Sequence, residues 1–218
     1  MTPASDPSPV YRTARGRLRG AVASRLARRA RDDRHATFFS LTGAGPTTRI
    51  LDVGCGALGL RAREPELDVT GLDIAPRPGY PGPFVLADAT DGLPFGDDAF
   101  DLVYCNSVIE HIAPAQRERF AAEIRRVGRG WLVQTPARSF PIEPHALLPF
   151  AHWLPARLRK PYWRLGVAGE WEDVRLLGRA EMRRLFGAPM PERLGPIVKS
   201  WVTVRTVDGR PVGEPPTG

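Results

Sequence analysis

The sequence predicts an α/β domain: a doubly wound, mostly parallel sheet of seven strands, with helices on both faces and an antiparallel closing strand. Three observations predict it. From residue 49 onward, short apolar strand patterns alternate with helical patterns, an order typical of parallel sheets. The first strand pattern runs directly into the glycine turn Gly54-Cys55-Gly56. Acidic residues end or follow the first three strand patterns, and ligands of open α/β sheets bind at that carboxyl edge.

Composition favours one self-sufficient domain. The chain has 218 residues, of which 42% are hydrophobic and 25% charged, so a core can form without metal or disulfide support. The two cysteines, Cys55 and Cys105, lack the spacing of metal ligands, so no metal site is predicted. No stretch has the length of an uncharged membrane helix, and no secretory signal pattern opens the chain. We therefore expect a cytoplasmic protein.

The net charge of +7 belongs almost entirely to the amino-terminal part. Residues 1–48 hold nine arginines and three aspartates, so the rest of the chain is nearly neutral and no nucleic-acid partner is expected. Residues 1–10 predict a disordered tail. Residues 11–48 predict a basic helical arm with a narrow apolar stripe, formed by Leu18, Val22 and Leu26. This arm is interpreted as a solvated helix, as a lid over a cofactor, or as a peripheral contact with the inner face of the membrane.

Strands and helices are then predicted in this order. Strand patterns occupy residues 49–53, 69–73, 84–87, 100–106 and 131–135, and an antiparallel hairpin closes the sheet around residues 197–204. Helical patterns start near Leu58, for barely two turns, and cover residues 34–41, 114–127 and 179–186. The main domain accordingly spans residues 49–206, and residues 207–218 are expected to form a flexible tail.

The glycine turn is compatible with two classes of cofactor. Gly54, Gly56 and Gly59 spell G-x-G-x-x-G, which would suit a nicotinamide oxidoreductase. However, Asp52 lies two residues before the first glycine, where its charge would repel the pyrophosphate of a dinucleotide. The same carboxylate would attract the ammonium and sulfonium groups of S-adenosylmethionine (SAM). We therefore favour SAM.

Two further aspartates support an adenosyl ligand. Asp73 ends the second strand, nineteen residues after Gly54, the spacing at which a carboxylate reaches the ribose hydroxyls. Asp88 follows the third strand, where it could accept a hydrogen bond from the adenine amine while the backbone at Ala89 meets the ring. Each aspartate alone is also typical of an ordinary turn. Together they place the acidic groups at one edge of the sheet.

These motifs resemble the Rossmann-like class I SAM-dependent methyltransferases, in particular the type 11 group that includes quinone-biosynthesis enzymes. The resemblance covers about residues 49–135 and rests on Ile50-Leu51-Asp52-Val53-Gly54-Cys55-Gly56, Val69-Thr70-Gly71-Leu72-Asp73-Ile74, Ala87-Asp88-Ala89, and Ser107-Val108-Ile109-Glu110-His111-Ile112. It implies a cofactor site formed by Asp52, Gly54, Cys55, Gly56, Asp73, Ile74, Asp88, Ala89 and Asn106. The group usually has G-x-G-x-G; here the third glycine is displaced to Gly59, which implies a more open pocket around the methionine end of SAM.

The predicted catalytic residues are histidines. Methyl transfer mainly requires alignment, with a base only where the acceptor loses a proton. His111 follows the fourth strand and is expected to face the methyl group, unless it only caps the local helix. His145, preceded by Glu143, belongs to the proline-rich, apolar segment 138–165, where a structural role is the simpler interpretation. The resemblance implies that this segment roofs a small, hydrophobic acceptor. The non-enzymatic alternative is a SAM-fold accessory protein that binds a membrane or partner through its basic arm.

Overall fold

The computed structural model describes residues 38–167 and 174–213. The chain divides into two compact units, and the described part of the larger one comprises residues 38–140 and 174–213, while that of the smaller one comprises residues 141–167. The predicted disordered tail and the first helix of the basic arm lie outside the described residues. Each unit is described by itself below.

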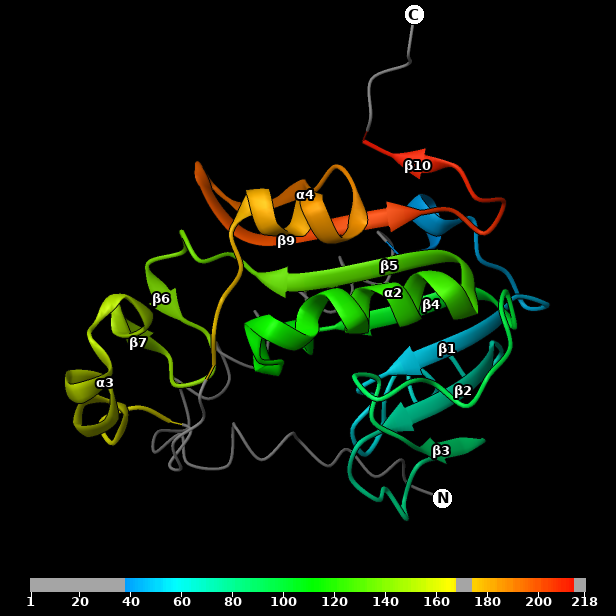
Figure 1. The fold of residues 1–218 in the computed structure, drawn as a ribbon, viewed down its shortest axis with the longest axis horizontal. Coiled ribbons are helices and arrows are strands. Elements are labelled where there is room, and N and C mark those ends of the chain that lie inside the picture. The colour runs from blue at the N-terminus through cyan, green and yellow to red at the C-terminus, as the bar shows by residue number, and fades with distance from the viewer. Residues whose placement is uncertain (1–37, 168–173, 214–218) are drawn as a thin grey trace, which may run out of the picture. The chain divides into compact units, whose positions relative to one another are not determined.

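The larger unit is built on one mixed sheet (Figure 1). Its strands are β1 (Arg49–Val53), β2 (Asp68–Asp73), β3 (Phe84–Leu86), β4 (Phe100–Asn106), β5 (Gly128–Pro136), β8 (Met190–Leu194), β9 (Ile197–Arg205) and β10 (Pro211–Val212). The order across the sheet is β10-β9-β5-β4-β1-β2-β3, with β8 paired to β9. The first five strands pair in parallel, and β9 is antiparallel to β5. The predicted fold class is therefore confirmed, with eight strands instead of seven.

The additional strand, β10, lies in the segment predicted to be a flexible tail. It pairs with the end of β9, opposite Val204 and Arg205. The turn between the two strands is fixed by a hydrogen bond of 2.8 Å from the amide of Thr206 to the carbonyl of Arg210, and Gly209 adopts a positive φ of 78° there. Gly209 permits this tight turn because it lacks a Cβ. The prediction was wrong for residues 211–212, and residues 214–218 lie outside the described part.

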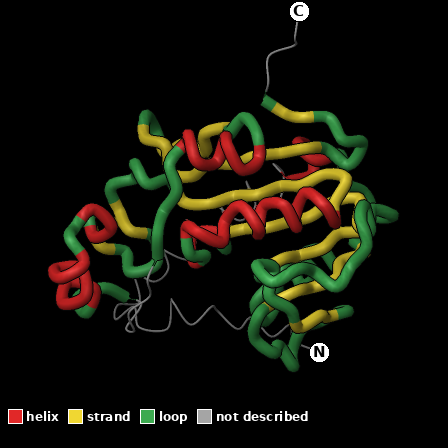
Figure 2. The backbone as a smooth tube through the Cα atoms, in the orientation of Figure 1, coloured by secondary structure: helices red, strands yellow, loops and turns green. Residues whose placement is uncertain are grey.

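Successive side chains of each strand point to opposite faces of the sheet, so they pack into two separate cores. Leu51 and Val103 face the core that is covered by helices α2 (Arg117–Val127) and α4 (Arg179–Phe186). Figures 1 and 2 show both helices on the same face of the sheet. Helix α2 follows the 3-10 turn Pro114–Gln116 and presents Phe120 and Ile124, both fully buried, to the strands.

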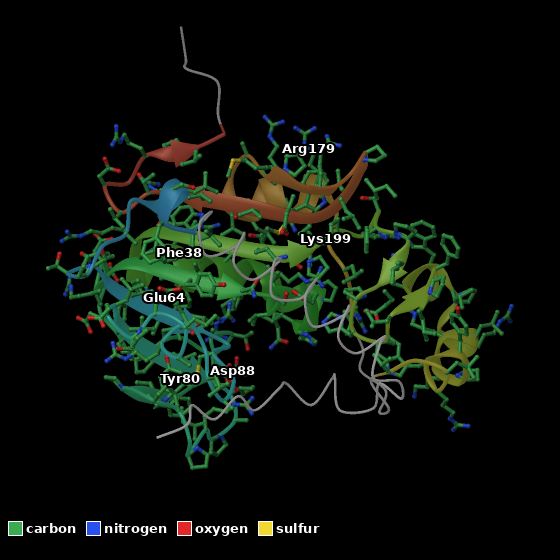
Figure 3. All side chains as sticks on the ribbon, turned by 180° about the vertical axis from the view of Figure 1, so that it is seen from behind. Phe38, Glu64, Tyr80, Asp88, Arg179 and Lys199 are labelled. Atoms are coloured by element: carbon green, nitrogen blue, oxygen red, sulfur yellow. The ribbon has the colours of Figure 1, made fainter. Side chains whose placement is uncertain are left out.

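The opposite face is covered by shorter segments. Residues 38–42 are helical, which confirms the end of the predicted helix 34–41. Phe38 from this helix contacts Tyr104 of β4 with ring centroids 5.4 Å apart in an edge-to-face arrangement. Figure 3, which views the molecule from behind, labels Phe38 on this face. Ile50, Leu60, Leu67 and Leu102 complete the core there.

The two-turn helix predicted near Leu58 is wrong. Residues 56–63 form turns, in which only isolated helical hydrogen bonds occur, such as the one of 3.2 Å from the amide of Ala62 to the carbonyl of Leu58. Gly59 has a φ of +58°, a left-handed conformation that no right-handed helix accepts. Pro65 then ends any continuation, because it lacks an amide hydrogen.

The smaller unit contains a short antiparallel hairpin and two helices. The hairpin pairs β6 (Ile142–Glu143) with β7 (Leu148–Pro149), and the 3-10 helix Ala151–Trp153 and helix α3 (Ala156–Trp163) follow it. The unit includes most of the segment 138–165, whose role as a roof over the acceptor stays a prediction. Among the described residues of both units, no helix combines the length and the apolar composition needed to span a membrane.

Candidate functional site

The glycine turn after β1 holds the first strand against the second. The amides of Gly54 and Cys55 both donate to the carbonyl of Leu72 on β2, at 2.8 and 3.1 Å. Gly54 has a φ of +71°, and a Cβ built on it would lie 2.3 Å from Cγ2 of Val108. The chain after β4 therefore approaches this turn so closely that only glycine fits.

Asp52 stabilises this turn from inside the protein. Its side chain is buried, and its Oδ2 accepts a hydrogen bond of 2.6 Å from the amide of Leu60. Burial raises the pKa of Asp52 to about 6, although the Leu60 amide and the charge of Arg63 act in the opposite direction. A Cβ on Gly59 would lie only 2.5 Å from the same Oδ2. The displaced glycine is thus required by the buried carboxylate.

Asp73 lies at the end of β2 and is surrounded by donors. Its Oδ2 accepts from the amide of Gly56 and from Nε of Arg77, both at 3.0 Å. Its Oδ1 accepts from the amide of Ala75 at 3.0 Å and from Nη2 of Arg77 at 3.1 Å. Burial tends to raise the pKa of Asp73, but these hydrogen bonds outweigh it and hold the pKa below its usual value. Asp73 is therefore an ionised acceptor at neutral pH.

Asp88, after β3, lies in a turn that its own side chain stabilises. Its Oδ1 accepts from the amide and the hydroxyl of Thr90, both at 2.8 Å. The hydroxyl of Thr90 in turn accepts from Nε2 of Gln116 at 3.3 Å. Figure 3 labels Asp88 in the part of the larger unit formed by β2 and β3. Gln116, which sequence reasoning did not single out, links this turn to the start of α2.

A cavity of about 520 Å³ opens at the carboxyl ends of the parallel strands. Such a volume lies within the range of small-molecule and cofactor sites. Five of the predicted cofactor residues line it: Gly54, Asp73, Ile74, Asp88 and Ala89. Ile74 is 70% exposed, so it offers an apolar surface against which a planar ring can pack. The acidic and apolar groups thus meet in one place, at the edge of the sheet expected from the topology.

Four predicted cofactor residues are not part of the cavity lining. Asp52 and Cys55 are buried below the turn, and Asn106 is half-buried at the end of β4. Gly56 acts through its amide on Asp73. Burial raises the pKa of Cys55 to about 12, so its thiol is protonated at neutral pH. Their direct contact with a cofactor stays a prediction, while the structure gives Asp52 and Gly56 positioning roles.

The segment after β4 forms the other wall of the cavity. Ser107 has a φ of +58°, an uncommon conformation for a residue other than glycine, and its amide donates to the carbonyl of Gln134 at 2.9 Å. The 3-10 turn Ile109–His111 follows and brings the exposed His111 to the cavity wall. Of the two histidines predicted to be catalytic, His111 is therefore the one that lines this cavity.

His145 lies in the smaller unit, where it forms a pair with Glu143. Nδ1 of His145 is 2.8 Å from Oε1 of Glu143, and Oε2 of Glu143 accepts a hydrogen bond of 2.6 Å from the amide of Ala146. Burial pushes the pKa of Glu143 upward, but the hydrogen bonds from His145 and Ala146 bring it below its usual value. Since ionised Glu143 only accepts hydrogen bonds, Nδ1 of His145 carries the proton in this pair.

Sequence reasoning missed the role of Arg77. Its guanidinium group covers both oxygens of Asp73, and its side chain lines the cavity. The spacing of four residues between an aspartate and an arginine was the available signal, although residues 73–77 are not helical. The Arg77–Asp73 ion pair therefore lies at the wall of the cavity.

Comparisons with known proteins concern the sequence family and the fold. Residues 51–132 match the family model described as a methyltransferase domain, of type 11. The structure is similar to that of the PH0226 protein from Pyrococcus horikoshii, with 18% sequence identity, a TM-score of 0.59, and coverage of 90% of this chain and 94% of that chain. This likeness shows the fold.

Two other solved structures are also similar. One is a SAM-dependent methyltransferase from Methanosarcina mazei, with 17% identity, a TM-score of 0.49, and coverage of 74% of this chain and 92% of that chain. The other is a SAM-dependent methyltransferase from Archaeoglobus fulgidus, with 23% identity, a TM-score of 0.42, and coverage of 53% and 54%. None of the curated proteins compared with this chain matches it.

Proposed function

Residues 51–132 match the model of a type 11 methyltransferase domain, and we propose that this chain is a SAM-dependent methyltransferase that acts on a small, hydrophobic acceptor. The observation that carries the proposal is the cavity at the carboxyl edge of the sheet, where Asp73, Asp88 and Ile74 converge. In this proposal Asp73 accepts from the ribose hydroxyls, Asp88 from the adenine amine, and Ile74 packs on the adenine ring. The domain match and the acidic lining both favour SAM over a nicotinamide cofactor.

The acceptor side of the proposal needs a base where the acceptor loses a proton. SAM, when bound, supplies a methyl carbon that is electrophilic because it is attached to a positively charged sulfur. His111, on the cavity wall, would take the proton that an acceptor hydroxyl or acidic carbon loses. His145, paired with Glu143 in the smaller unit, is the alternative base. The apolar composition of segment 138–165 supports a hydrophobic acceptor.

The experiment that tests the proposal uses SAM labelled in its methyl group. We expect S-adenosylhomocysteine and a labelled product in the organic phase of a cell extract, identified by mass spectrometry. With that acceptor, His111→Gln is expected to lower kcat by roughly 100-fold, because a general base contributes about this factor. His152→Gln, in the smaller unit, is the matched control and is expected to retain activity.

Several outcomes would contradict parts of the proposal. Formation of no S-adenosylhomocysteine with any extract would favour the accessory-protein alternative. A labelled product that is a protein or a nucleic acid would overturn the acceptor class. An unchanged kcat in His111→Gln, together with a lowered one in His145→Gln, would assign the base to the smaller unit.

Arg77 leads to a separate prediction for cofactor affinity. A carboxylate offers about four acceptor positions, and in Asp73 all four are used by Gly56, Ala75 and the two nitrogens of Arg77. Ribose hydroxyls can therefore bind Asp73 only if Arg77 moves. The side chain of Arg77 is 35% exposed, so its ion pair is screened and contributes only about 1 kcal/mol. We expect Arg77→Ala to bind SAM roughly fivefold more tightly in calorimetry.

The control for this prediction is another arginine–aspartate pair on the same sheet. Arg49→Ala removes the pair between Arg49 and Asp101, which lies at the amino ends of β1 and β4, away from the cavity. It is expected to leave the affinity for SAM unchanged. Weaker binding by Arg77→Ala would mean that the guanidinium group itself contacts the cofactor.

A further inference from the structure

The smaller unit exposes an unusual number of large apolar side chains. Six of them between residues 144 and 167 are at least 40% exposed: Leu147, Phe150, Trp153, Leu158, Leu165 and Val167. Leu165 reaches 76%. Isolated exposed apolar residues are ordinary on protein surfaces, whereas contiguous apolar patches mark interaction surfaces.

The backbone holds part of this group in place. Leu147 and Phe150 have φ values of 53° and 58°, the left-handed conformation that residues with a Cβ rarely adopt. The amide of Phe150 donates to the carbonyl of Pro141 at 2.6 Å, which fixes the turn after β7. The ring of Phe150 then packs on Trp153 with centroids 5.3 Å apart, while both side chains remain about half exposed. A strained turn that displays two aromatic rings is typical of a binding element.

The charged side chains of the same segment are all positive. Between residues 144 and 167 the sequence contains Arg157, Arg159, Lys160 and Arg164, and it contains no aspartate or glutamate. Arg157, Lys160 and Arg164 are exposed, and their spacing of three and four residues places them on one side of α3 and its carboxyl end. Leu158 lies beside this basic stripe on the same helix.

We propose that residues 144–167 form a membrane-binding face for anionic phospholipids. The aromatic pair and the exposed leucines would enter the boundary between head groups and acyl chains, and the basic stripe would lie against the lipid phosphates. Aromatic residues with flanking cations are suited to this boundary, since it is apolar on one side and hydrated on the other. Negative lipids are the occupant that the uniform positive charge favours. This surface differs from the basic amino-terminal arm, and the proposal does not depend on methyl transfer.

The test uses the full chain and sedimentation with vesicles. We expect binding to vesicles of phosphatidylcholine mixed with phosphatidylglycerol, little binding to phosphatidylcholine alone, and weaker binding at high salt. The double variant Phe150→Ser with Trp153→Ser is expected to lower vesicle affinity by roughly tenfold or more, because both rings leave the interface. A triple variant of Arg157, Lys160 and Arg164 to glutamine is expected to lower it by a similar factor.

The matched control replaces apolar residues of equal exposure in the larger unit. Leu86 and Leu194 are 57% and 62% exposed, and the double variant Leu86→Ser with Leu194→Ser is expected to bind vesicles like the wild type. Thermal unfolding verifies that each variant is folded. Vesicle binding that neither the aromatic nor the basic variant weakens would overturn the proposal and assign the affinity to another segment. Unchanged vesicle binding with a raised KM for the methyl acceptor would assign the aromatic pair to the acceptor pocket instead.

Discussion

Replacing Asp73 by alanine is expected to weaken SAM binding by at least about 100-fold. Two ribose hydroxyls would donate to one ionised carboxylate, and hydrogen bonds to a charged group contribute roughly 1.5 to 3 kcal/mol each. The substitution also removes the acceptor that positions the amide of Gly56, so the glycine turn loses a contact. Calorimetry with SAM and with S-adenosylhomocysteine measures the effect directly, without knowledge of the acceptor.

The control lies on the same strand. Asp68 begins β2, at the end opposite Asp73, and is exposed. Asp68→Ala is therefore expected to retain wild-type affinity. Asp73→Asn keeps the shape of the side chain but loses its charge, and we expect an intermediate loss. Equal affinities of Asp73→Ala and the wild type would show that the ribose is bound elsewhere.

The same experiment tests the competition with Arg77. If the guanidinium group only occupies the acceptor positions of Asp73, its removal can increase affinity only while Asp73 is present. In a double-mutant cycle, the gain expected from Arg77→Ala should therefore disappear in the Asp73→Ala background. A gain that persists in that background would point to an effect of charge alone, because SAM itself carries a net positive charge.

Replacing Gly59 by alanine is expected to destabilise the protein by about 3 kcal/mol. The positive φ of 58° costs an alanine roughly 1 to 2 kcal/mol. Its Cβ would also lie 2.5 Å from Oδ2 of Asp52 and 2.9 Å from the ring of Tyr80, and such overpacking costs about 1 to 3 kcal/mol more. In a chain of this length the melting temperature should fall by roughly 6 to 12 °C. Calorimetric unfolding measures both quantities.

Variants at two other glycines separate the cost of the positive φ from the cost of the close contacts. Gly56 also has a positive φ, of 61°, but a Cβ on it would meet no atom within 4 Å, so Gly56→Ala should lose only about 1 to 2 kcal/mol. Gly96 lacks a positive φ and has the same free space, so Gly96→Ala should leave stability unchanged or slightly increased. If all three variants melt at the same temperature, the turn is more adaptable than its close contacts indicate.

The fold could be predicted from the sequence to a large extent. The parallel strands are short apolar runs bounded by turn residues, and the Phe100–Asn106 strand was predicted with its observed ends. Predictions from local sequence patterns were wrong where contacts between distant segments determine the local structure. The helix predicted at Leu58 is replaced by turns because Gly59 must leave room for Asp52 and for the ring of Tyr80. The strand β10 exists because the end of β9 offers it a partner.

The types of residue in the candidate site could be predicted from the sequence, but the contacts between these residues could be predicted less well. Asp73 and Asp88 could be identified because residues at the ends of adjacent parallel strands meet at one edge of the sheet. The pairing of Asp73 with Arg77 and that of Glu143 with His145 depends on turn conformations that no periodicity specifies. The burial of Asp52 could not be predicted either, because the residue types of a motif do not indicate whether a charged side chain points into the core or toward a ligand.

The sequence by itself determined the succession of the parallel strands, the edge of the sheet at which Asp73 and Asp88 lie, and the resemblance to SAM-dependent methyltransferases. These depend on local patterns of apolar residues, glycines and carboxylates. Only the tertiary structure decided which carboxylate lines the cavity, which one supports the turn, and which donor already occupies Asp73. Those assignments depend on contacts between segments far apart in the chain, where burial and hydrogen-bond geometry, rather than residue type, set the role of each side chain.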